Sequence, residues 1–311
     1  MQGTEHSDKT KAVIAAIVAN FIFGLSFMAS RIAMQHTTPS MLLCVRFAVC
    51  VLAMSVLAAS GIVRIDLKGK PVGKFLLLGL FHPILYFIGE TNGINYSNSS
   101  FAGIIVSLIP VAAAGFSAIF LREKMSLSKL AWVLVSVAGV AIISMSQTSE
   151  GAVQVKGVLF LLLAVAGGAM FYIMSSILAD DVTPFERTFV MMVMGFIFFT
   201  LMAVAKQGRS FLPVLTAAVT DKYVMLPIVY LSLISAVIAF TLLNYAVNYL
   251  DVTSATVFAN ITPIVSVIAG VLVLDEPFSP VMLLGMALIL IGVFKVNSAD
   301  AGKETGSHEE G

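Results

Sequence analysis

Two ionisable side chains stand inside long apolar runs, where chemistry could be carried out. Glu90 lies in LYFIGETNGINY and Arg46 lies in PSMLLCVRFAV. A charge within hydrocarbon is costly, so such residues are functional candidates by default. Glu90 could bind a cationic group or carry a proton, and Arg46 could bind a carboxylate, so that together they would suit a zwitterion. Alternatively, Glu90 is hydrated and pairs with Arg31, or Arg46 pairs with Glu90 or with backbone carbonyls.

Other polar residues in the apolar runs could line a substrate cavity together with Glu90 and Arg46. His82 precedes Glu90 by eight residues, which puts both on one helix face. It could relay protons, or it could be a satisfied structural histidine. The remaining candidates could line the cavity or anchor the membrane interface, where tyrosines are common: Asn20, Tyr86, Tyr172, Asn244 and Tyr245.

Two prolines interrupt apolar runs in matching contexts, SLIPVAAAGFSAIFLREK and NITPIVSVIAGVLVLDEP. Pro110 and Pro263 each remove a backbone donor and displace the carbonyl four residues earlier. Ser107 and Asn260 lie three residues before these prolines. Each kink could line a substrate cavity or could be a structural bend, and Asn260 could bond the freed backbone or face the substrate.

Each of these stretches ends with a glutamate, Glu123 or Glu276, thirteen residues after its proline. A carboxylate at a helix C-terminus opposes the helix dipole. It becomes favourable when it accepts hydrogen bonds from the N-terminus of another helix. We therefore predict structural roles, with Glu123 joining the fourth span to the fifth and Glu276 joining the ninth to the tenth.

The composition indicates that lipid is the solvent for most of this surface. Of the 311 residues, 59% are hydrophobic and 11% are charged, against about a quarter charged in soluble domains. Apolar runs of the length that crosses a bilayer recur along the chain. None shows strand alternation, which favours an all-α integral membrane protein over a barrel. The ten predicted spans are 12–34, 40–60, 73–94, 99–121, 128–146, 157–178, 185–205, 224–247, 253–274 and 279–296.

The chain also contains an internal repeat. Shifted by 153 residues, Asn95-Tyr96 falls on Asn248-Tyr249, Pro110 on Pro263, Glu123 on Glu276 and Gly139 on Gly292. Upstream, a shift of 145 places Lys11 on Lys156 and Pro39 on Pro184. We predict two five-helix repeats, residues 12–147 and 156–296, between polar tails at 1–10 and 297–311. Because five is odd, the second repeat enters the membrane from the opposite side, a signature of secondary transporters. Leu243 matches Glu90 under this shift, so charge chemistry there is one-sided.

The distribution of basic residues predicts the orientation. With both termini in the cytoplasm, twelve lysines and arginines fall on the cytoplasmic side and five on the other, with Arg46 inside a span. Cytoplasmic loops carry the excess of basic residues. We therefore expect a multi-pass protein of the cell membrane with both termini cytoplasmic.

The sequence resembles the EamA-type branch of the drug/metabolite transporter superfamily over about 280 residues. The resemblance rests on NFIFGLSFMASRIA, on PSMLLCVRFAV, and on the paired segments that begin at NYSNSSFAG and NYLDVTSAT. It implies a ten-helix bundle that moves small metabolites by alternating access. The sequence departs from symmetry where Trp132 stands opposite Gly285, which predicts a bulkier contact around the fifth span.

These observations favour a secondary transporter of small organic metabolites, such as amino acids or related compounds, and the resemblance to the family implies export as the direction. A proton is one candidate coupling ion, and a homodimer stays open. The net charge of +1 gives no reason to expect nucleic-acid binding. No nucleotide-binding loop, catalytic triad or metal-ligand spacing is present, so we expect neither an enzyme nor a cofactor. The alternative is a receptor or assembly subunit that keeps the fold without transport.

Overall fold

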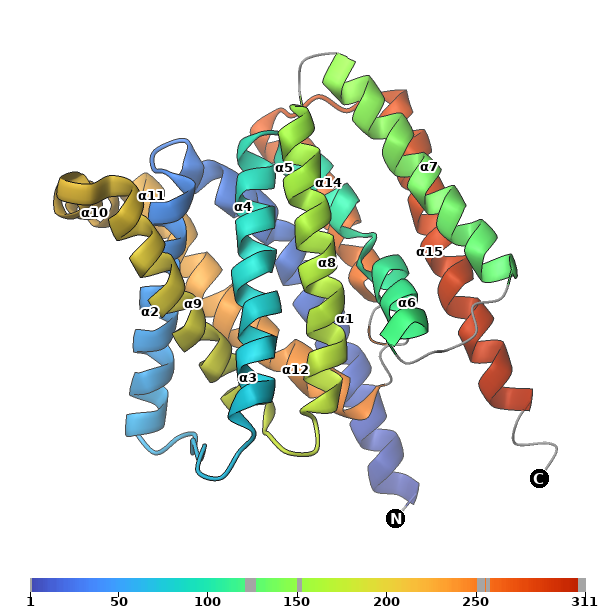
Figure 1. Cartoon of the computed structure of the whole chain (residues 1–311), viewed down its shortest axis with the longest axis horizontal. Helices are drawn as coiled ribbons and strands as arrows, with labels where there is room; N and C mark the ends of the chain where they lie inside the picture. Colours follow the sequence, from blue (N-terminus) through green and yellow to red (C-terminus); the bar gives the residue numbers. More distant parts are fainter. Residues whose placement is uncertain (1, 121–126, 150–152, 251–254, 256–257, 307–311) are drawn as a thin grey trace.

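The chain folds into a bundle of helices. The computed structural model describes residues 2–120, 127–149, 153–250, 255 and 258–306, and every regular element in these ranges is a helix (Figure 1). Seven helical stretches are long and apolar enough to cross a membrane, and three shorter apolar helices bring the number of spans to ten. The prediction of an all-α integral membrane protein with ten spans is confirmed.

The first repeat supplies five spans, two of which are interrupted. They are α1 (Gln2–Met34), α2 (Pro39–Ala59), α3–η1–α4 (Val72–Gly79, Leu80–Leu85 and Tyr86–Asn95), α5–α6 (Ser99–Val106 and Ile109–Phe120) and α7 (Leu127–Ser149). The third span is irregular at His82, whose φ of −144° and ψ of 115° are not helical. Pro83 follows it, and a proline disfavours helical geometry in the residue before it. The fourth span breaks between Val106 and Ile109, directly before Pro110.

The second repeat has the same plan. Its spans are α8 (Val155–Ile177), α9 (Pro184–Gln207), α11–η3–α12 (Lys222–Val229, Tyr230–Ala239 and Phe240–Tyr249), η4–α14 (Phe258–Asn260 and Ile261–Leu274) and α15 (Pro280–Gly306). Between α9 and α11 the chain forms η2 (Gly208–Ser210) and α10 (Phe211–Thr220), which lies to the side of the bundle (Figure 1). The irregular third and fourth spans of the first repeat therefore have counterparts in the eighth and ninth.

The two repeats interlock. Besides a contact between α1 and α14, the main helix contacts join α7 to α15, α2 to α9, α5 to α14, α4 to α8 and α1 to α12. The first three join equivalent spans of the two repeats, and the last two are equivalent to each other after exchange of the repeats. This is the contact pattern of a two-fold pseudo-axis in the membrane plane, as an inverted repeat requires.

The glycines shared by the repeats explain the close packing of α7 on α15. A Cβ built on Gly139 would lie 2.7 Å from the backbone oxygen of Gly285, and one on Gly292 would lie 2.7 Å from that of Trp132. Small residues at such crossings let helices approach closely in a membrane. The Trp132 position contributes its backbone here, with Lys295 located 5.8 Å from the centre of its ring.

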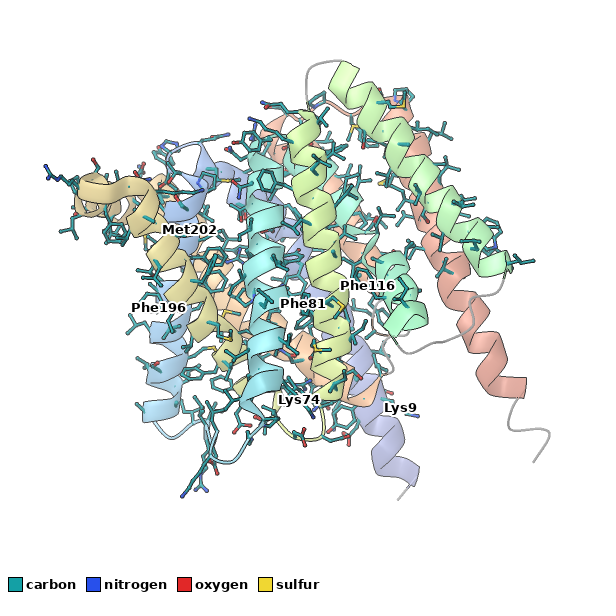
Figure 2. All side chains as sticks on the ribbon, in the orientation of Figure 1. Lys9, Lys74, Phe81, Phe116, Phe196 and Met202 are labelled. Atoms are coloured by element: carbon teal, nitrogen blue, oxygen red, sulfur yellow. The ribbon has the colours of Figure 1, made fainter. Side chains whose placement is uncertain are left out.

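The surface of the bundle has the polarity that a bilayer requires. Large apolar side chains project outward from many spans, including Leu52, Leu76 and Leu272, which are 66%, 57% and 76% exposed. In Figure 2, Phe196 and Met202 lie along α9, whereas Lys9 and Lys74 lie toward the end of the bundle where α1 begins. The start of α1 and the end of α15 both lie at that end of the bundle (Figure 1).

Candidate functional site

A central cavity lies between the repeats and brings together half of the predicted cavity residues. Asn20, Arg46, His82, Tyr86, Glu90 and Tyr172 all line it. Its volume, measured for the centre of a water-sized sphere, is about 50 Å³, which is room for a few water molecules. Helices of both repeats form the walls.

Arg46 is a buried cation in the wall of the cavity. Its side chain projects from α2, the residue is 1% exposed, and its Nε and Nη1 have no hydrogen-bond partner. The guanidinium carbon lies 4.4 Å from the centre of the Phe87 ring. In the described part of the chain, Arg46 forms no salt bridge with any carboxylate. A buried charge that lacks a partner is strongly destabilising, so this guanidinium is available for an anionic group in the cavity.

Glu90 projects from α4 toward the same cavity and is 2% exposed. Its Oε2 accepts a long hydrogen bond of 3.4 Å from the Thr91 hydroxyl. The proposed pairing with Arg31 is wrong, because Arg31 Nη1 instead donates to the Ile94 carbonyl oxygen at 3.3 Å. A carboxylate and a guanidinium thus face one enclosed space without forming a salt bridge to each other.

Aromatic rings surround His82 at the irregular turn of the third span. Its ring centre lies 4.5 Å from that of Tyr86, 4.7 Å from Phe240 and 5.0 Å from Phe171. The histidine is buried, and its Nδ1 has no hydrogen-bond partner. The irregular backbone places this ring among those lining the cavity rather than in a regular helix face.

The lining residues come in equivalent pairs from the two repeats. The shifts of 145 and 153 residues relate eight such pairs, which leave only Asn20, Arg46 and Tyr86 of the lining residues unmatched. The pairs are Phe23 and Gly168, Ser26 and Phe171, Phe27 and Tyr172, His82 and Ser235, Phe87 and Phe240, Glu90 and Leu243, Val106 and Ala259, and Ile109 and Thr262. The cavity is therefore symmetric in backbone position and asymmetric in side-chain chemistry.

The prolines shape the cavity without lining it. Val106 and Ile109 flank the break before Pro110 and line the cavity, as Ala259 and Thr262 do before Pro263. Neither proline, nor Ser107 or Asn260, is among the lining residues. The Ser107 hydroxyl donates to the Ile104 carbonyl at 2.6 Å, and the buried Oδ1 of Asn260 has no partner.

Asn244 and Tyr245 lie outside the cavity. Asn244 accepts a hydrogen bond from the Ser175 hydroxyl at 2.6 Å and donates to Thr188 Oγ1 at 3.0 Å. The Tyr245 ring lies 4.9 Å from that of Tyr249.

The centre of the Asn244 cluster is Arg187, which lies near the start of the predicted span 185–205. Arg187 is fully buried and donates to the carbonyl oxygens of Ser175 and Asn244, and to Asn248 Oδ1. The Ser175 carbonyl lies in the last turn of α8, where a cation complements the helix dipole, and the Asn244 carbonyl lies in the middle of α12. Arg187 therefore joins two spans of the second repeat.

Glu276 joins helices as predicted, but the predicted partner helix is wrong. Its two carboxylate oxygens accept four hydrogen bonds of 2.5 to 2.8 Å, from the backbone N–H and hydroxyl groups of Ser99 and Ser100. These residues form the N-terminus of α5 in the first repeat, not that of α15. Asp275, with φ of 51°, turns the chain so that Glu276 reaches α5. Glu123 lies outside the described residues.

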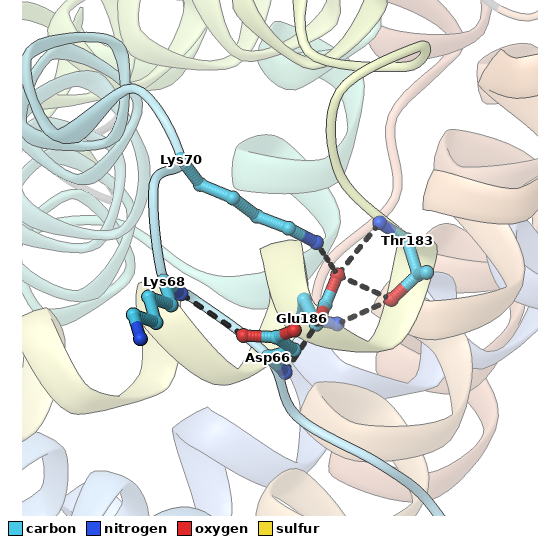
Figure 3. A network of polar contacts seen from close by, with 5 residues as sticks. All are labelled: Asp66, Lys68, Lys70, Thr183 and Glu186. Carbon is cyan, nitrogen blue, oxygen red and sulfur yellow. Dashed lines mark hydrogen bonds and ion pairs between the residues drawn. The ribbon is translucent and has the colours of Figure 1, made fainter.

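A polar network that was not predicted from the sequence joins the loop between the second and third spans to the start of the seventh span. Figure 3 shows Glu186 accepting hydrogen bonds from Lys70 Nζ at 2.6 Å, from the Asp66 backbone at 2.8 Å and from Thr183. Thr183 and Glu186 also form a capping box at the start of α9. The sequence TPFE contains the signature for that motif, a threonine followed three residues later by a glutamate. No group of three or more metal-binding side chains occurs in the described residues.

Comparison with known proteins agrees with this architecture. The model of the EamA-like transporter family matches residues 10–145 and 155–298. An uncharacterized transporter, YcxC of Bacillus subtilis, is 32% identical over 296 residues, with 93% of each chain covered. A probable terminal-alkyne amino-acid exporter of Streptantibioticus cattleyicolor is 25% identical and covers 94% of this chain and 96% of its own. One solved crystal structure matches the fold with a TM-score of 0.62 at 16% identity, covering 92% of this chain and 96% of its own.

Proposed function

The chain belongs to the EamA-like transporter family, and we propose that it moves a small zwitterionic metabolite, such as an amino acid or a related compound, across the cell membrane by alternating access. Binding takes place in the central cavity, which has room for a few water molecules in this conformation and widens to take the substrate when the repeats rock about it. Export is the proposed direction, because a relative over nearly the whole chain is named a probable amino-acid exporter. The orientation places both termini in the cytoplasm, in accordance with the basic residues.

One observation carries this proposal: a guanidinium and a carboxylate face the same enclosed cavity without pairing. Within the described residues, Arg46 has nitrogen atoms that lack partners, and Glu90 accepts one long hydrogen bond. A carboxylate of the substrate would give Arg46 the charge-assisted, two-point contact for which guanidinium geometry is suited. An ammonium group would do the same for Glu90. A zwitterion satisfies both groups at once, whereas an anion or a cation satisfies one.

Glu90 is also the proposed proton carrier if transport is coupled to a proton gradient. Intramembrane carboxylates commonly serve proton relays in transporters. The Glu90→Gln variant keeps the size of the side chain but carries no ionisable proton. Transport in wild-type liposomes that does not respond to an imposed pH gradient would contradict coupling and leave facilitated diffusion.

Binding can be tested with the purified full chain in detergent. The thermal unfolding midpoint is measured against a panel of zwitterionic, anionic, cationic and neutral metabolites, because a ligand that binds the native state raises it. We expect zwitterions to raise the midpoint in the wild type, and this effect to disappear in Arg46→Gln and Glu90→Gln. Retention of the effect in both variants would contradict the proposed site. A protein that responds to no metabolite at all would fit a receptor or assembly subunit instead.

A further inference from the structure

The paired lining positions show that the two repeats contribute different chemistry to one cavity. The cation and the carboxylate that line it both come from the first repeat, since Arg46 lies on α2 and Glu90 on α4. Leu243 stands at the position equivalent to Glu90, and Ser235 at that of His82. Met191, which is equivalent to Arg46, is fully buried and does not line the cavity.

The wall from the second repeat is mostly apolar and aromatic. Phe171, Phe240 and Leu243 are 2%, 4% and 3% exposed, and the rings of Phe171 and Phe240 lie 6.0 Å apart in an edge-to-face arrangement. Tyr172 adds a further ring with one phenolic hydroxyl.

The other two hydroxyls of this wall are already engaged with the first repeat. Ser235 accepts a hydrogen bond from Ser26 at 2.8 Å, and Thr262 donates to Asn20 at 3.1 Å. On this side a polar substituent of a ligand would find the hydroxyl protons of Ser235 and Tyr172 and otherwise apolar surface. A polar group buried without a partner is disfavoured.

We propose that the substrate lies across the pseudo-axis, with its charged head group against the first repeat and an apolar side chain in a pocket of the second repeat formed by Phe171, Tyr172, Phe240 and Leu243. The substrate class is thus a zwitterion with an aliphatic or aromatic side chain. This inference rests on the proposed function and deepens it, because it divides recognition between the repeats. Leu243 is the specificity-determining position. It is the equivalent of Glu90 in the second repeat, and it contacts the side chain of the substrate where Glu90 binds the ammonium group.

The inference predicts selectivity within a set of amino acids that share one head group. We expect leucine, norleucine and phenylalanine to compete at least about tenfold better than glutamine or serine, since a single methylene in an apolar pocket already changes selectivity by about 10- to 200-fold. Competition is measured against whichever zwitterion from the panel is bound, using the wild-type chain in liposomes. Equal competition by polar and apolar amino acids would overturn the inference.

Two variants of Leu243 sharpen the test. Leu243→Gln supplies hydrogen-bonding groups at nearly the same volume, so the preference for leucine over glutamine should fall by about tenfold or more. Leu243→Met is the matched control, because it stays apolar and should keep the wild-type preference. Glu90→Gln should abolish binding of leucine and glutamine alike, because it removes the partner of the ammonium group that all amino acids share.

The outcomes separate this inference from the proposed function. Zwitterion binding with a leucine-to-glutamine preference unchanged by Leu243→Gln would overturn the inference and leave the proposed function standing. Loss of all zwitterion binding in the wild type would overturn both. If Leu243→Gln does not fold, the wild-type competition series decides the question by itself.

Discussion

At the residue scale, function follows from groups that the fold leaves unsatisfied. Most buried polar groups here have partners. The Asn20 carbonyl accepts a hydrogen bond from Thr262, and Arg187 donates to backbone carbonyl oxygens of α8 and α12. Arg46 is different, because its Nε and Nη1 lack partners although the residue is buried. Buried nitrogen atoms without hydrogen-bond partners destabilise the empty protein, and a ligand that binds this guanidinium would offset that cost.

This account predicts that Arg46→Met makes the empty protein more stable and unable to bind. Removal of the buried cation with its unpartnered nitrogen atoms should raise the free energy of unfolding, and removal of the guanidinium should abolish zwitterion binding. Thermal unfolding in detergent with and without ligand measures both effects. A lower midpoint for Arg46→Met than for the wild type would show that the cation has a structural partner.

The sequence could predict the charged residues of the site but not its apolar wall. Arg46 and Glu90 stand out because charges within apolar runs are rare. Phe171, Phe240 and Leu243 do not, because an aromatic or aliphatic side chain in a membrane span has the same sequence signal whether it faces lipid, a neighbouring helix or a cavity. The repeat offers a route to part of this wall: a shift of 153 residues places Glu90 on Leu243, which the sequence already indicated, and Phe87 on Phe240, which it had not been used to pair.

At the element scale, charged and small residues fix how helices of different repeats meet. Glu276 at the end of α14 caps the N-terminus of α5, and glycines allow α7 to contact α15. The carboxylate role could be predicted from its place at a helix end, but its partner helix could not. Chain connectivity brings the start of α15 near Glu276, and only the three-dimensional packing shows that α5 is the helix it reaches.

Glu276→Gln should lower stability, whereas Asp275→Asn should not. The amide supplies one acceptor oxygen where the carboxylate supplies two, so two of the four donors on Ser99 and Ser100 lose their partner. Unsatisfied buried donors cost about 1–3 kcal/mol each. Asp275 is exposed, and asparagine tolerates its left-handed backbone geometry. Equal unfolding midpoints for the two variants would contradict the assigned role of Glu276.

Two glycine substitutions should have opposite effects. Gly139→Ala places a methyl group 2.7 Å from the Gly285 backbone oxygen, so α7 and α15 must separate and stability should fall. Gly115→Ala lies on α6 with no atom within 4 Å of the new Cβ, so stability should rise by about 1 kcal/mol through helix propensity. Thermal unfolding of both variants in one detergent provides the comparison. A destabilising Gly115→Ala together with a neutral Gly139→Ala would refute this account of the packing.

At the scale of the whole molecule, the inverted repeat arranges the helices symmetrically. The side chains at equivalent positions of the two repeats have diverged, so the two sides of the ligand site differ in chemistry. The ten apolar runs and the matched prolines and glutamates predicted this frame, because hydrophobic length and repeat spacing determine it. The cavity follows from the crossing of interrupted spans near the pseudo-axis, which apolar composition alone does not locate. Eight pairs of equivalent positions line it, but both charged groups, Arg46 and Glu90, come from the first repeat.

The central claim is that this cavity carries a zwitterion across the membrane, held by Arg46 and Glu90. Counterflow into liposomes that contain the purified chain and are preloaded with an unlabelled zwitterionic metabolite tests it most directly. The account predicts saturable accumulation of the labelled metabolite by the wild type, and its loss in Arg46→Gln and Glu90→Gln at equal protein incorporation. Counterflow that persists undiminished in both variants would contradict it.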